Sequence, residues 1–573
     1  MKFCASALRR EGKGRVREKV CVCERERPRY FIRGSKSSSK QSLSPMSIAR
    51  MRASEVFEVV PKPVSLTGQW MKEKIVRQIR RSENGRLTWS FWLIVLALIR
   101  VTLITWVALL LLILYCSSPK AYSAVLVQVM EFLGSTFIKL GQWASTRRDL
   151  FSEDFCDTLA HLQRKSSNHS WMYTEFLMSA TFGPQWEKLF RRIDREPIGS
   201  GCCAQVHKAW VDQNKLKLYK ANDDFHTPVY LHVLEHLRIG FILDFISSGY
   251  SRRRVISEKS KDNELMPVVV KVMHPGVENY IVTDLFMIEF LSILTSLLVP
   301  SLRWLDLPGC VREFSIMMLN QLDMKIEARN LHRFLSNFSR THTVIFPTPL
   351  KNLTTRKILV ESYHEGNHIS EYFKLSDHDD LKKQVFNIVI PLVIKMVFKD
   401  NFFHCDLHPG NILVQEEDIP RCRKNKTQLY QRIFSFYGNK SPRIVILDCG
   451  LVSSLNDRCL QNLRHVFHAI ITGKGTQVGD YLMRHSNHMT PDPEGFKMAI
   501  ENIIKRHITN KITPQNVNLI AVMKEFYTAL IDYKVQQDSA FVNVMLTVLL
   551  IENLGRNLDP TNDVLQELIT FLH

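Results

Sequence analysis

The stretch "FFHCDLHPGN", residues 402–411, is compatible with two kinds of fold and chemistry. His404, Asp406 and His408 stand at alternate positions, and the stretch ends in Pro-Gly-Asn. Alternate residues of a strand share one face, so these three side chains could be the ligands of a metal-dependent hydrolase. The same residues are also compatible with a catalytic loop for phosphoryl transfer, in which Asn411 follows Asp406 by five residues. Residues far from this stretch must distinguish the two interpretations.

A glycine-rich stretch, "GSGCCA" at residues 199–204, precedes a strand-like run. Its small residues have the spacing of a loop whose backbone approaches phosphates, and they are Gly199, Ser200, Gly201 and Ala204. A plain hairpin turn is the alternative interpretation. The spacing alone therefore predicts a nucleotide loop only weakly.

Three more residues point to the same chemistry. "MPVVVKVMHPG", residues 266–276, predicts a buried strand in which Lys271 needs a counter-charge, because an unpaired buried charge is costly. Glu327, in a helical run at residues 324–334, can supply it. Asp448 follows an apolar strand within "PRIVILDCGLVSSL".

The order of these parts predicts a protein-kinase-like fold. Lys271 would contact phosphate, Glu327 would hold Lys271, and Asp406 would be the catalytic aspartate. Asn411 and Asp448 supply the hard oxygen ligands that Mg²⁺ prefers, so ATP (or ADP) and Mg²⁺ are the expected cofactors. In this interpretation His404 organises the loop by hydrogen bonding, and His408 lies near the phosphates or packs structurally.

The formal net charge of +20 is concentrated near the N-terminal end. Residues 1–86 contain 22 Lys or Arg against eight Glu and no Asp, and the remainder is only mildly basic. A nucleic-acid-binding domain needs a basic face within a fold, so no nucleic-acid partner is expected. Residues 27–54 lack acidic residues, which is typical of a mitochondrial targeting segment, with a disordered basic tail as the alternative.

Residues 87–118 contain the longest apolar stretch and predict one N-terminal transmembrane helix. Arg100 divides the stretch, and a charge at mid-bilayer costs about 2.5–3.5 kcal/mol, whereas near a helix end it can reach the headgroups. We therefore expect a single tilted span, or a shorter one over residues 101–118. A helix buried in the protein and a helix lying in the membrane interface are the alternatives.

Residues 123–165 have the apolar periodicity of helices, with a second helix start near Ser152. In "FIKLGQ", Lys139 and Gln142 are three residues apart, so they share a helix face and could meet one partner. From these two residues alone, a solvated edge is the favoured interpretation.

Five stretches together resemble the UbiB family of atypical kinases, the aarF-domain-containing kinases. They are "FIKLGQWAS", "VVVKVMHPGV", "QLDMKIEARNLHRF", "HCDLHPGNIL" and "ILDCGL". The resemblance covers roughly residues 123–480, and it implies nucleotide binding with Mg²⁺ at mitochondrial or plastid membranes. It also implies support of coenzyme Q or other isoprenoid lipid metabolism. The implied partners are a membrane or isoprenoid lipid and coenzyme Q biosynthesis proteins.

The resemblance implies that Lys139 and Gln142 belong to a signature helix that folds over the nucleotide pocket, where a protein substrate would otherwise lie. Three departures from the family pattern are expected to matter. Gln321 replaces an acidic residue, so Lys139 is expected to pair with Asp323 or to be held loosely. The nucleotide loop is glycine-rich rather than alanine-rich, and Cys449 replaces a Phe.

The sequence thus predicts an α+β, two-lobed protein-kinase-like fold with an added N-terminal signature helix, a helical C-lobe and one transmembrane helix. The expected segments are a disordered targeting segment at 1–86, a transmembrane segment at 87–118, a signature extension at 123–165, an N-lobe at 190–365 with an insertion at 212–262, and a C-lobe at 366–573 with an insertion at 415–443.

The leading hypothesis is an ATP-binding, single-pass protein of the mitochondrial membrane, acting as an Mg²⁺-dependent ATPase or phosphotransferase. A catalytically silent pseudokinase that acts as a nucleotide-dependent scaffold is the alternative. The metal-dependent hydrolase is the distant alternative.

Overall fold

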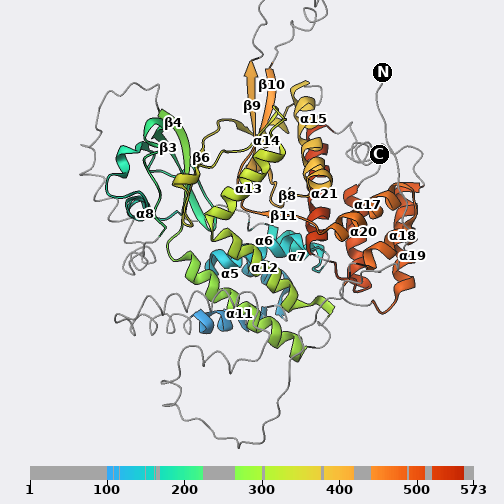
Figure 1. The fold of residues 1–573 in the computed structure, drawn as a ribbon. Helices are drawn as coiled ribbons and strands as arrows, with labels where there is room; N and C mark the ends of the chain where they lie inside the picture. Colours follow the sequence, from blue (N-terminus) through green and yellow to red (C-terminus); the bar gives the residue numbers. More distant parts are fainter. Residues whose placement is uncertain are drawn as a thin grey trace, which may run out of the picture. The chain divides into compact units, whose positions relative to one another are not determined.

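The computed structural model describes residues 100–559 with gaps, the longest of which are 224–264, 419–439 and 510–518. The predicted targeting segment at 1–86 and residues 87–99 of the predicted transmembrane segment lie outside the described residues. So does most of the insertion expected at 212–262. Figure 1 shows the arrangement of the described elements.

The smaller lobe is built on a five-stranded sheet in which β1, β3, β4 and β6 are neighbours and β2 pairs with β3. All these pairings are antiparallel. Its strands are β1 (Phe190–Ile193), β2 (Gly199–Ser200), β3 (Ala204–Asp212), β4 (Leu265–Met273) and β6 (Ile358–Ser362). β4 confirms the strand predicted at residues 266–276.

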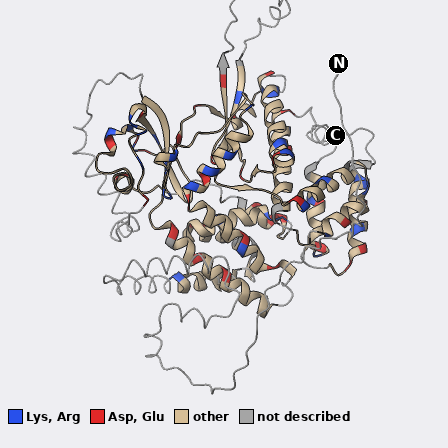
Figure 2. Ribbon diagram, in the orientation of Figure 1, with Lys and Arg blue, Asp and Glu red and all other residues tan. Residues whose placement is uncertain are grey.

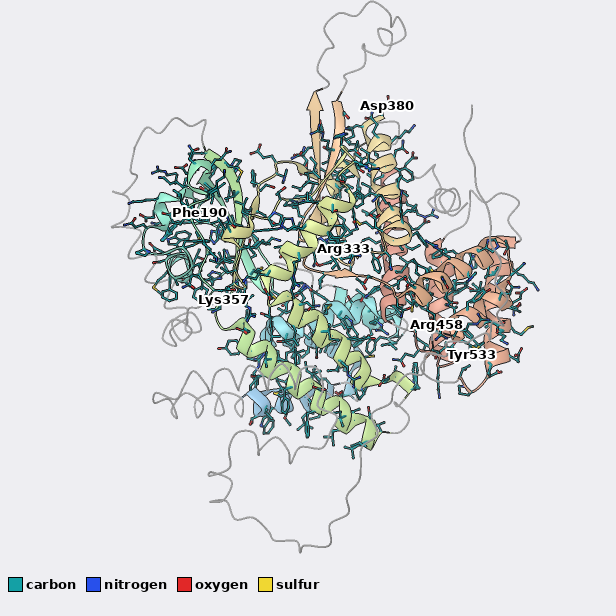
Figure 3. The ribbon with its side chains drawn as sticks, viewed as in Figure 1. Phe190, Arg333, Lys357, Asp380, Arg458 and Tyr533 are labelled. Atoms are coloured by element: carbon teal, nitrogen blue, oxygen red, sulfur yellow. The ribbon has the colours of Figure 1, made fainter. Side chains whose placement is uncertain are left out.

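One face of this sheet packs against helix α8 (Trp171–Phe182), which precedes the predicted start of the N-lobe at residue 190. Val268, Val270 and Val272 alternate along β4 and share a core with α8 and Phe190. Figure 3 labels Phe190 beside this sheet. Because side chains alternate across a strand, Lys271 emerges on the opposite face of β4.

The predicted helical extension is present as three helices that pack on one another. They are α5 (Pro119–Leu133), α6 (Ser135–Thr146) and α7 (Glu153–Ala160), and α7 begins directly after Ser152. α6 also contacts α11 (Val277–Leu298) and α12 (Leu307–Gln321), two helices that the sequence analysis did not predict. The extension is therefore held against helices that follow β4 in the chain.

The predicted transmembrane segment is only partly described, and a span there is not established. Its described part includes the short apolar helix Arg100–Leu111. Among the described helices, only residues Tyr280–Leu298 of α11 are long and apolar enough to cross a membrane, and a third of that stretch is buried in the protein. By length and composition, α11 is therefore the candidate for a membrane-crossing helix among the described helices.

Arg100 forms a bidentate ion pair with Asp284 of α11, with its Nε and one Nη each 3.0 Å from a carboxylate oxygen. The same guanidinium donates to the carbonyl of Leu133. A cluster of apolar residues that includes Ile104, Phe137 and Met287 surrounds this contact. The charge that divides the apolar stretch is therefore neutralised within the protein rather than at a membrane surface.

The larger lobe contains helix α13 (Met324–Asn337), which confirms the helical run predicted at residues 324–334. Its sheet has the order β5-β10-β9-β7, in which β5 is Val344–Ile345 and β7 is Asn367–His368. Strand β8 (Phe403–His404) pairs separately with β11 (Val452–Ser453). The predicted helical C-terminal region is confirmed. Its helices are α15 (Asp380–Ile394), α17 (Asp457–Ile471), α18 (Gly475–Met483), α19 (Pro493–Ile504), α20 (Leu519–Asp532) and α21 (Ser539–Leu558).

The insertion expected as a loop at 415–443 begins and ends as sheet. β9 (Ile412–Asp418) and β10 (Lys440–Ile446) pair antiparallel along their whole lengths, with Lys440 opposite Asp418. The predicted loop boundaries were therefore wrong, because polar residues can continue a ladder whose hydrogen bonds come from the backbone.

Candidate active site

Three acidic side chains from different elements surround Lys271. The Nζ of Lys271 is 2.5 Å from Oε1 of Glu327 on α13, 3.7 Å from Oε1 of Glu361 on β6 and 3.8 Å from Oδ1 of Asp448. Lys271, Glu327 and Glu361 are buried. The predicted pairing of Lys271 with Glu327 is present, and the structure adds Glu361, which sequence reasoning missed.

Charge within this cluster shifts the pKa of each member. Burial opposes the charge of Lys271, but the attraction of Glu327, Glu361 and Asp448 outweighs it and raises the lysine pKa well above its usual range. Burial raises the pKa of Glu327 to about 8, more than the nearby ammonium lowers it. Lys271 therefore stays protonated. Its single ammonium faces three acidic side chains, those of Glu327, Glu361 and Asp448, and cannot neutralise all of them.

Asp448 lies in the turn after β10, in the left-handed backbone region with a φ of 51°. Its side chain is 58% exposed, so it can reach a ligand as well as Lys271. Lys271 is the main cause that lowers the pKa of Asp448 to about 2, and Lys139 and His404 contribute. Asp448 is therefore ionised throughout the physiological pH range.

His404 ties the opening stretch to the Asp448 turn. Its Nδ1 accepts a hydrogen bond from the backbone N–H of Asp406 at 3.0 Å, and its Nε2 donates to the carbonyl of Asp448 at 3.0 Å. The Asn411 amide donates to the carbonyl of Asp406 at 2.9 Å, which leaves the amide oxygen as the remaining acceptor. His404 thus organises the loop, as the kinase-like interpretation predicts.

The metal-hydrolase interpretation finds no support in these contacts. Both ring nitrogens of His404 are engaged by the backbone, and His408 accepts from the N–H of Gly410 at the start of a short 3₁₀ turn. Within the described residues, no three His, Cys, Asp or Glu side chains are grouped as metal ligands. The alternation in the opening stretch is therefore a loop pattern and not a ligand pattern.

The glycine loop is the turn of the β2–β3 hairpin. Gly199 and Gly201 have ordinary backbone angles, and a methyl group added at Gly199 would meet no atom within 4 Å. The Ser200 hydroxyl is buried and has no hydrogen-bond partner among the described residues. Gly201 and Ala204 of this loop line the cavity described below, whereas Gly199 and Ser200 do not.

Helix α6 brings Lys139 close to the glycine loop. Lys139 is half-buried, and the attraction of Asp406, the two cysteines of the glycine loop and Asp448 raises its pKa although burial opposes this. The expected pairing with Asp323 is not formed. Asp323 instead caps α13 by accepting from the N–H of Lys325.

The other residues of "KLGQ" take part in the packing of helix α6. A methyl group at Gly141 would lie 2.2 Å from Leu162 Cδ1 and 2.8 Å from Met130 Sδ, so the ends of these two side chains would have to shift to admit a larger residue. Gln142 donates to the carbonyl of Leu162 at 2.9 Å. Lys139 and Gln142 therefore do not share a partner, and Gln142 is not among the residues that line the cavity.

These elements enclose one cavity of about 130 Å³. Its lining includes Lys139, Lys271, Glu327, Asp448 and the loop residues 201–204. Gln321 also lines it and accepts a weak hydrogen bond from the thiol of Cys203 at 3.8 Å. The cavity is small beside the 300 Å³ or more that is usual for a small-molecule site, so a whole nucleotide requires the lining to move apart.

Residues 161–218 and 255–482 match the ABC1 atypical kinase-like domain. A mitochondrial ABC1 family protein of Schizosaccharomyces pombe is 31% identical, with 78% of this chain and 64% of that protein covered. The chain belongs to the ABC1 atypical kinase-like family.

Other ABC1 relatives are more distant. A mitochondrial ABC1 family protein of Saccharomyces cerevisiae is 28% identical over 78% of this chain and 67% of its own length. A probable protein kinase UbiB of Glaesserella parasuis is 25% identical over 77% of this chain and 68% of its own length. The chain spans about 64% of the length of the Schizosaccharomyces pombe relative.

Among solved structures, the Rv3197–erythromycin complex from Mycobacterium tuberculosis matches at 15% identity and a TM-score of 0.36, over 73% of this chain and 93% of that one. This likeness is too low to carry an argument, and the kinase-like assignment depends on the ABC1 domain match.

The cavity of this ABC1 family member fits the groups that a kinase-like fold implies, a nucleotide and Mg²⁺. Glu327, Glu361 and Asp448 lie within 4 Å of a single ammonium, that of Lys271, and Asp448 is the one of the three that is exposed and has a lowered pKa. A divalent cation would pair with this ionised carboxylate. Asp448, which is exposed, and Asn411, which is buried, are the oxygen donors that would hold it.

Proposed function

We propose that this ABC1 family protein binds ATP or ADP with Mg²⁺ and acts as an Mg²⁺-dependent ATPase or phosphotransferase. The observation that carries the proposal is the convergence of Lys271, Glu327 and Asp448 on one cavity. Such an arrangement supplies one fixed cation for phosphate oxygens and one carboxylate for the metal. The bound nucleotide and metal supply the phosphoryl group and neutralise its charge.

In this proposal Asp406 accepts the proton of the attacking hydroxyl or water. Its position is set by two backbone contacts, because its N–H binds His404 and its carbonyl accepts from Asn411. Asn411 would share the metal with Asp448. Glu327 holds Lys271 in place, so that the ammonium remains available to phosphate on its other side.

The site favours small acceptors or water over a protein substrate. Asp406 is foremost among the charges that raise the pKa of Lys139, so α6 brings a cation near the catalytic aspartate. The same observation supports the second candidate, a pseudokinase that binds nucleotide and switches a partner without turnover. The two candidates differ only in whether Asp406 has an acceptor.

Turnover by the purified full chain tests this choice. Release of ADP from ATP is measured with Mg²⁺, with and without liposomes, for the wild type, for Asp406→Asn and for Asp457→Asn on the first turn of α17 as a control. An ATPase or phosphotransferase loses turnover in Asp406→Asn alone and retains nucleotide binding. Equal, background turnover in all three with retained binding would favour the pseudokinase.

We also place the protein at the mitochondrial membrane. The names of the yeast relatives carry the word mitochondrial. The C-terminal part of α11 supports a lipid contact, because Phe290 and Leu297 are 60% and 65% exposed and residues 290–298 contain no charged side chain. Figure 2 shows this part of α11 without charge colouring. Such exposed apolar surface is costly in water.

Liposome flotation tests the membrane contact. Leu297→Glu should reduce binding to liposomes that contain anionic lipid, because a carboxylate would enter the apolar layer. Met498→Glu is the matched control, since Met498 is an exposed apolar residue of α19, far along the chain. Equal flotation of both variants and the wild type would contradict a contact through α11.

The finer proposal, that the activity supports coenzyme Q and lipid metabolism, follows from the resemblance to UbiB proteins. Membrane or isoprenoid lipid and coenzyme Q biosynthesis proteins would then be its partners. In cells that lack the protein, coenzyme Q content should recover with the wild type and not with Asp406→Asn. Unchanged content in the absence of the protein would contradict this role.

A further inference from the structure

A buried chain of histidines lies behind the glycine loop, outside the residues assigned to catalysis. His169 precedes α8, His207 is on β3, and His274 follows β4. Gln205 of β3 and Thr174 of α8 connect them. His169, His207, Gln205 and Thr174 are all buried, and His274 is partly buried.

The loop end of the chain fixes two tautomers. His274 Nε2 lies 2.9 Å from the carbonyl of Gly201, and a carbonyl only accepts, so this nitrogen carries the proton. The Nδ1 of a neutral His274 is then an acceptor. It lies 2.7 Å from Nδ1 of His169, which must donate. The Nε2 of His169 therefore accepts from the Thr174 hydroxyl at 2.9 Å.

The hydrogen bonds at the other end of the histidine chain, around His207, agree with these tautomers. His207 Nδ1 lies 2.9 Å from the carbonyl of Asp194, so it donates, and its Nε2 accepts from the Gln205 amide at 3.0 Å. That amide also donates to the Thr174 hydroxyl at 3.3 Å. The side-chain oxygen of Gln205 accepts from the backbone N–H of His169. Every member then has a compatible role, and all three histidines are neutral.

Protonation would break this chain at its shortest contact. A second proton on His274 would go to Nδ1 and turn the contact with His169 Nδ1 into two donors facing one another. A second proton on His169 would go to Nε2, where the Thr174 hydroxyl now donates. Burial lowers the pKa of all three histidines, and neighbouring histidines lower that of His169 further. The backbone and charge of Asp194 oppose this at His207, and the Gly201 carbonyl opposes it at His274.

We propose that His274 is a positioning residue for the nucleotide loop, and that the neutral histidine chain behind it makes nucleotide affinity fall in acid. His274 holds the turn at two points, because its ring donates to Gly201 and its backbone N–H donates to the carbonyl of Cys203 at 2.9 Å. The inference depends on the proposed nucleotide site, since the loop is the part of that site that His274 holds.

The direction of the pH effect follows from the linkage between proton binding and folding. A histidine whose pKa is lowered by folding binds fewer protons in the folded state than in the unfolded state. The stability that the chain contributes is therefore complete above about pH 6.5, the value of an unperturbed histidine, and is lost as the pH falls below it. Order in the loop, and with it nucleotide affinity, should follow the same direction.

The test measures the dissociation constants of Mg²⁺–ADP and of a non-hydrolysable Mg²⁺–ATP analogue between pH 5.5 and pH 7.5. The full chain is compared with His274→Leu, His274→Gln and the control His342→Leu, an exposed histidine after α13. Because the phosphates of the nucleotide also titrate, the ratio of variant to wild type at each pH is the readout. Thermal unfolding without nucleotide shows whether each variant is folded.

At pH 7.5, His274→Leu should weaken binding about five- to tenfold, the effect expected for one lost hydrogen bond. His274→Gln keeps an N–H donor without a titrating proton, so it should bind like the wild type at pH 7.5 and lose less affinity than the wild type at pH 5.5. His342→Leu should follow the wild type at each pH.

The inference is overturned if folded His274→Leu and His274→Gln both follow the affinity and pH profile of the wild type. Should His274→Leu fail to fold, the His274→Gln profile decides alone. A wild type that binds neither nucleotide at any pH would overturn the proposed function, and the inference with it. That outcome is distinct from wild-type binding that His274 does not affect.

Discussion

Two lysines from different elements line the cavity, and they are held in different ways. Lys271 extends from a central strand and has Glu327, Glu361 and Asp448 within 4 Å of its ammonium. Lys139 extends from α6, and the charges of Asp406 and Asp448 raise its pKa. Within the described residues, Lys139 forms no direct ion pair with either of them. One cation is fixed by its neighbours, and the other depends on where its helix lies.

This difference suggests separate tasks for the two lysines. A fixed ammonium provides a constant charge for phosphate, because moving it would strand buried carboxylates. Lys139 can leave its place if α6 moves, and the cavity of about 130 Å³ must widen to admit a nucleotide. The strand lysine therefore belongs to the permanent framework, and the helix lysine to the part that adjusts.

The largest expected effect is on stability. Lys271→Met leaves Glu327 and Glu361 buried without their cation and should lower the free energy of unfolding by about 3–5 kcal/mol. Since carboxyls with raised pKa values gain protons as the pH falls, this loss should shrink between pH 8 and pH 5. Chemical denaturation measures both quantities.

Lys208→Met is the matched control for this prediction. Lys208 lies on the adjacent strand β3, and its ion-pair partner Glu365 is 79% exposed. Its replacement should change the free energy of unfolding by less than about 1 kcal/mol. Equal destabilisation by the two substitutions would show that Lys271 is not the fixed member of the comparison.

Asp448→Asn should have the next largest effect, on metal-dependent binding. Asp448 is the carboxylate that both lysines face, and its low pKa keeps it charged. Loss of this charge should weaken Mg²⁺-dependent nucleotide binding by about 100-fold or more, beyond the 10- to 100-fold usual for outer-shell partners of a metal site. Titration with Mn²⁺, followed by its paramagnetic signal, measures metal binding directly. Unchanged Mn²⁺ affinity would remove Asp448 from the proposed ligands.

Gly141→Ala tests whether α6 must pack closely to place Lys139. The added methyl group meets the ends of Leu162 and Met130, so a loss of about 1–3 kcal/mol in the free energy of unfolding is expected. Leu162→Ala removes the nearest of these atoms, and the double variant should be less destabilised than the sum of the single variants. Additive losses would mean that the contact is not what requires glycine.

Lys139→Met should have the smallest effect and should change two affinities in opposite directions. Without its charge, Asp406 and Asp448 are less neutralised, so Mn²⁺ should bind about three- to tenfold more tightly, or about 0.7–1.4 kcal/mol. Nucleotide without metal should bind more weakly, because one cation near the phosphates is lost. Stability should change little. Loss of both affinities would place Lys139 with Lys271 as a fixed part of the site.

Much of the site could be predicted because its residues follow strands and turns in a recognisable order. Lys271, Glu327 and Asp448 each stand at a position that local sequence identifies, and the structure brings them together. Glu361 could not be found in this way. Its proximity to Lys271 depends on which strand lies beside β4, and strand neighbours are a property of the whole sheet.

The fold was predicted least well where tertiary contacts decide. α11 and α12 were not predicted, and neither was the partner of Arg100, because an apolar helix has the same sequence whether protein or lipid covers it. The partners of Gln142 and Asp323 were also missed. Each binds backbone groups, and the location of free backbone groups depends on where helices end.

The ion pair between Arg100 and Asp284 also sets an order of events during synthesis. Asp284 follows Arg100 by 184 residues, so at about 5–20 residues per second the arginine is made roughly 10–40 s before its partner. Until then, the apolar helix carries an unpaired charge. Docking of this helix is therefore a late step, which must wait until α11 has been completed.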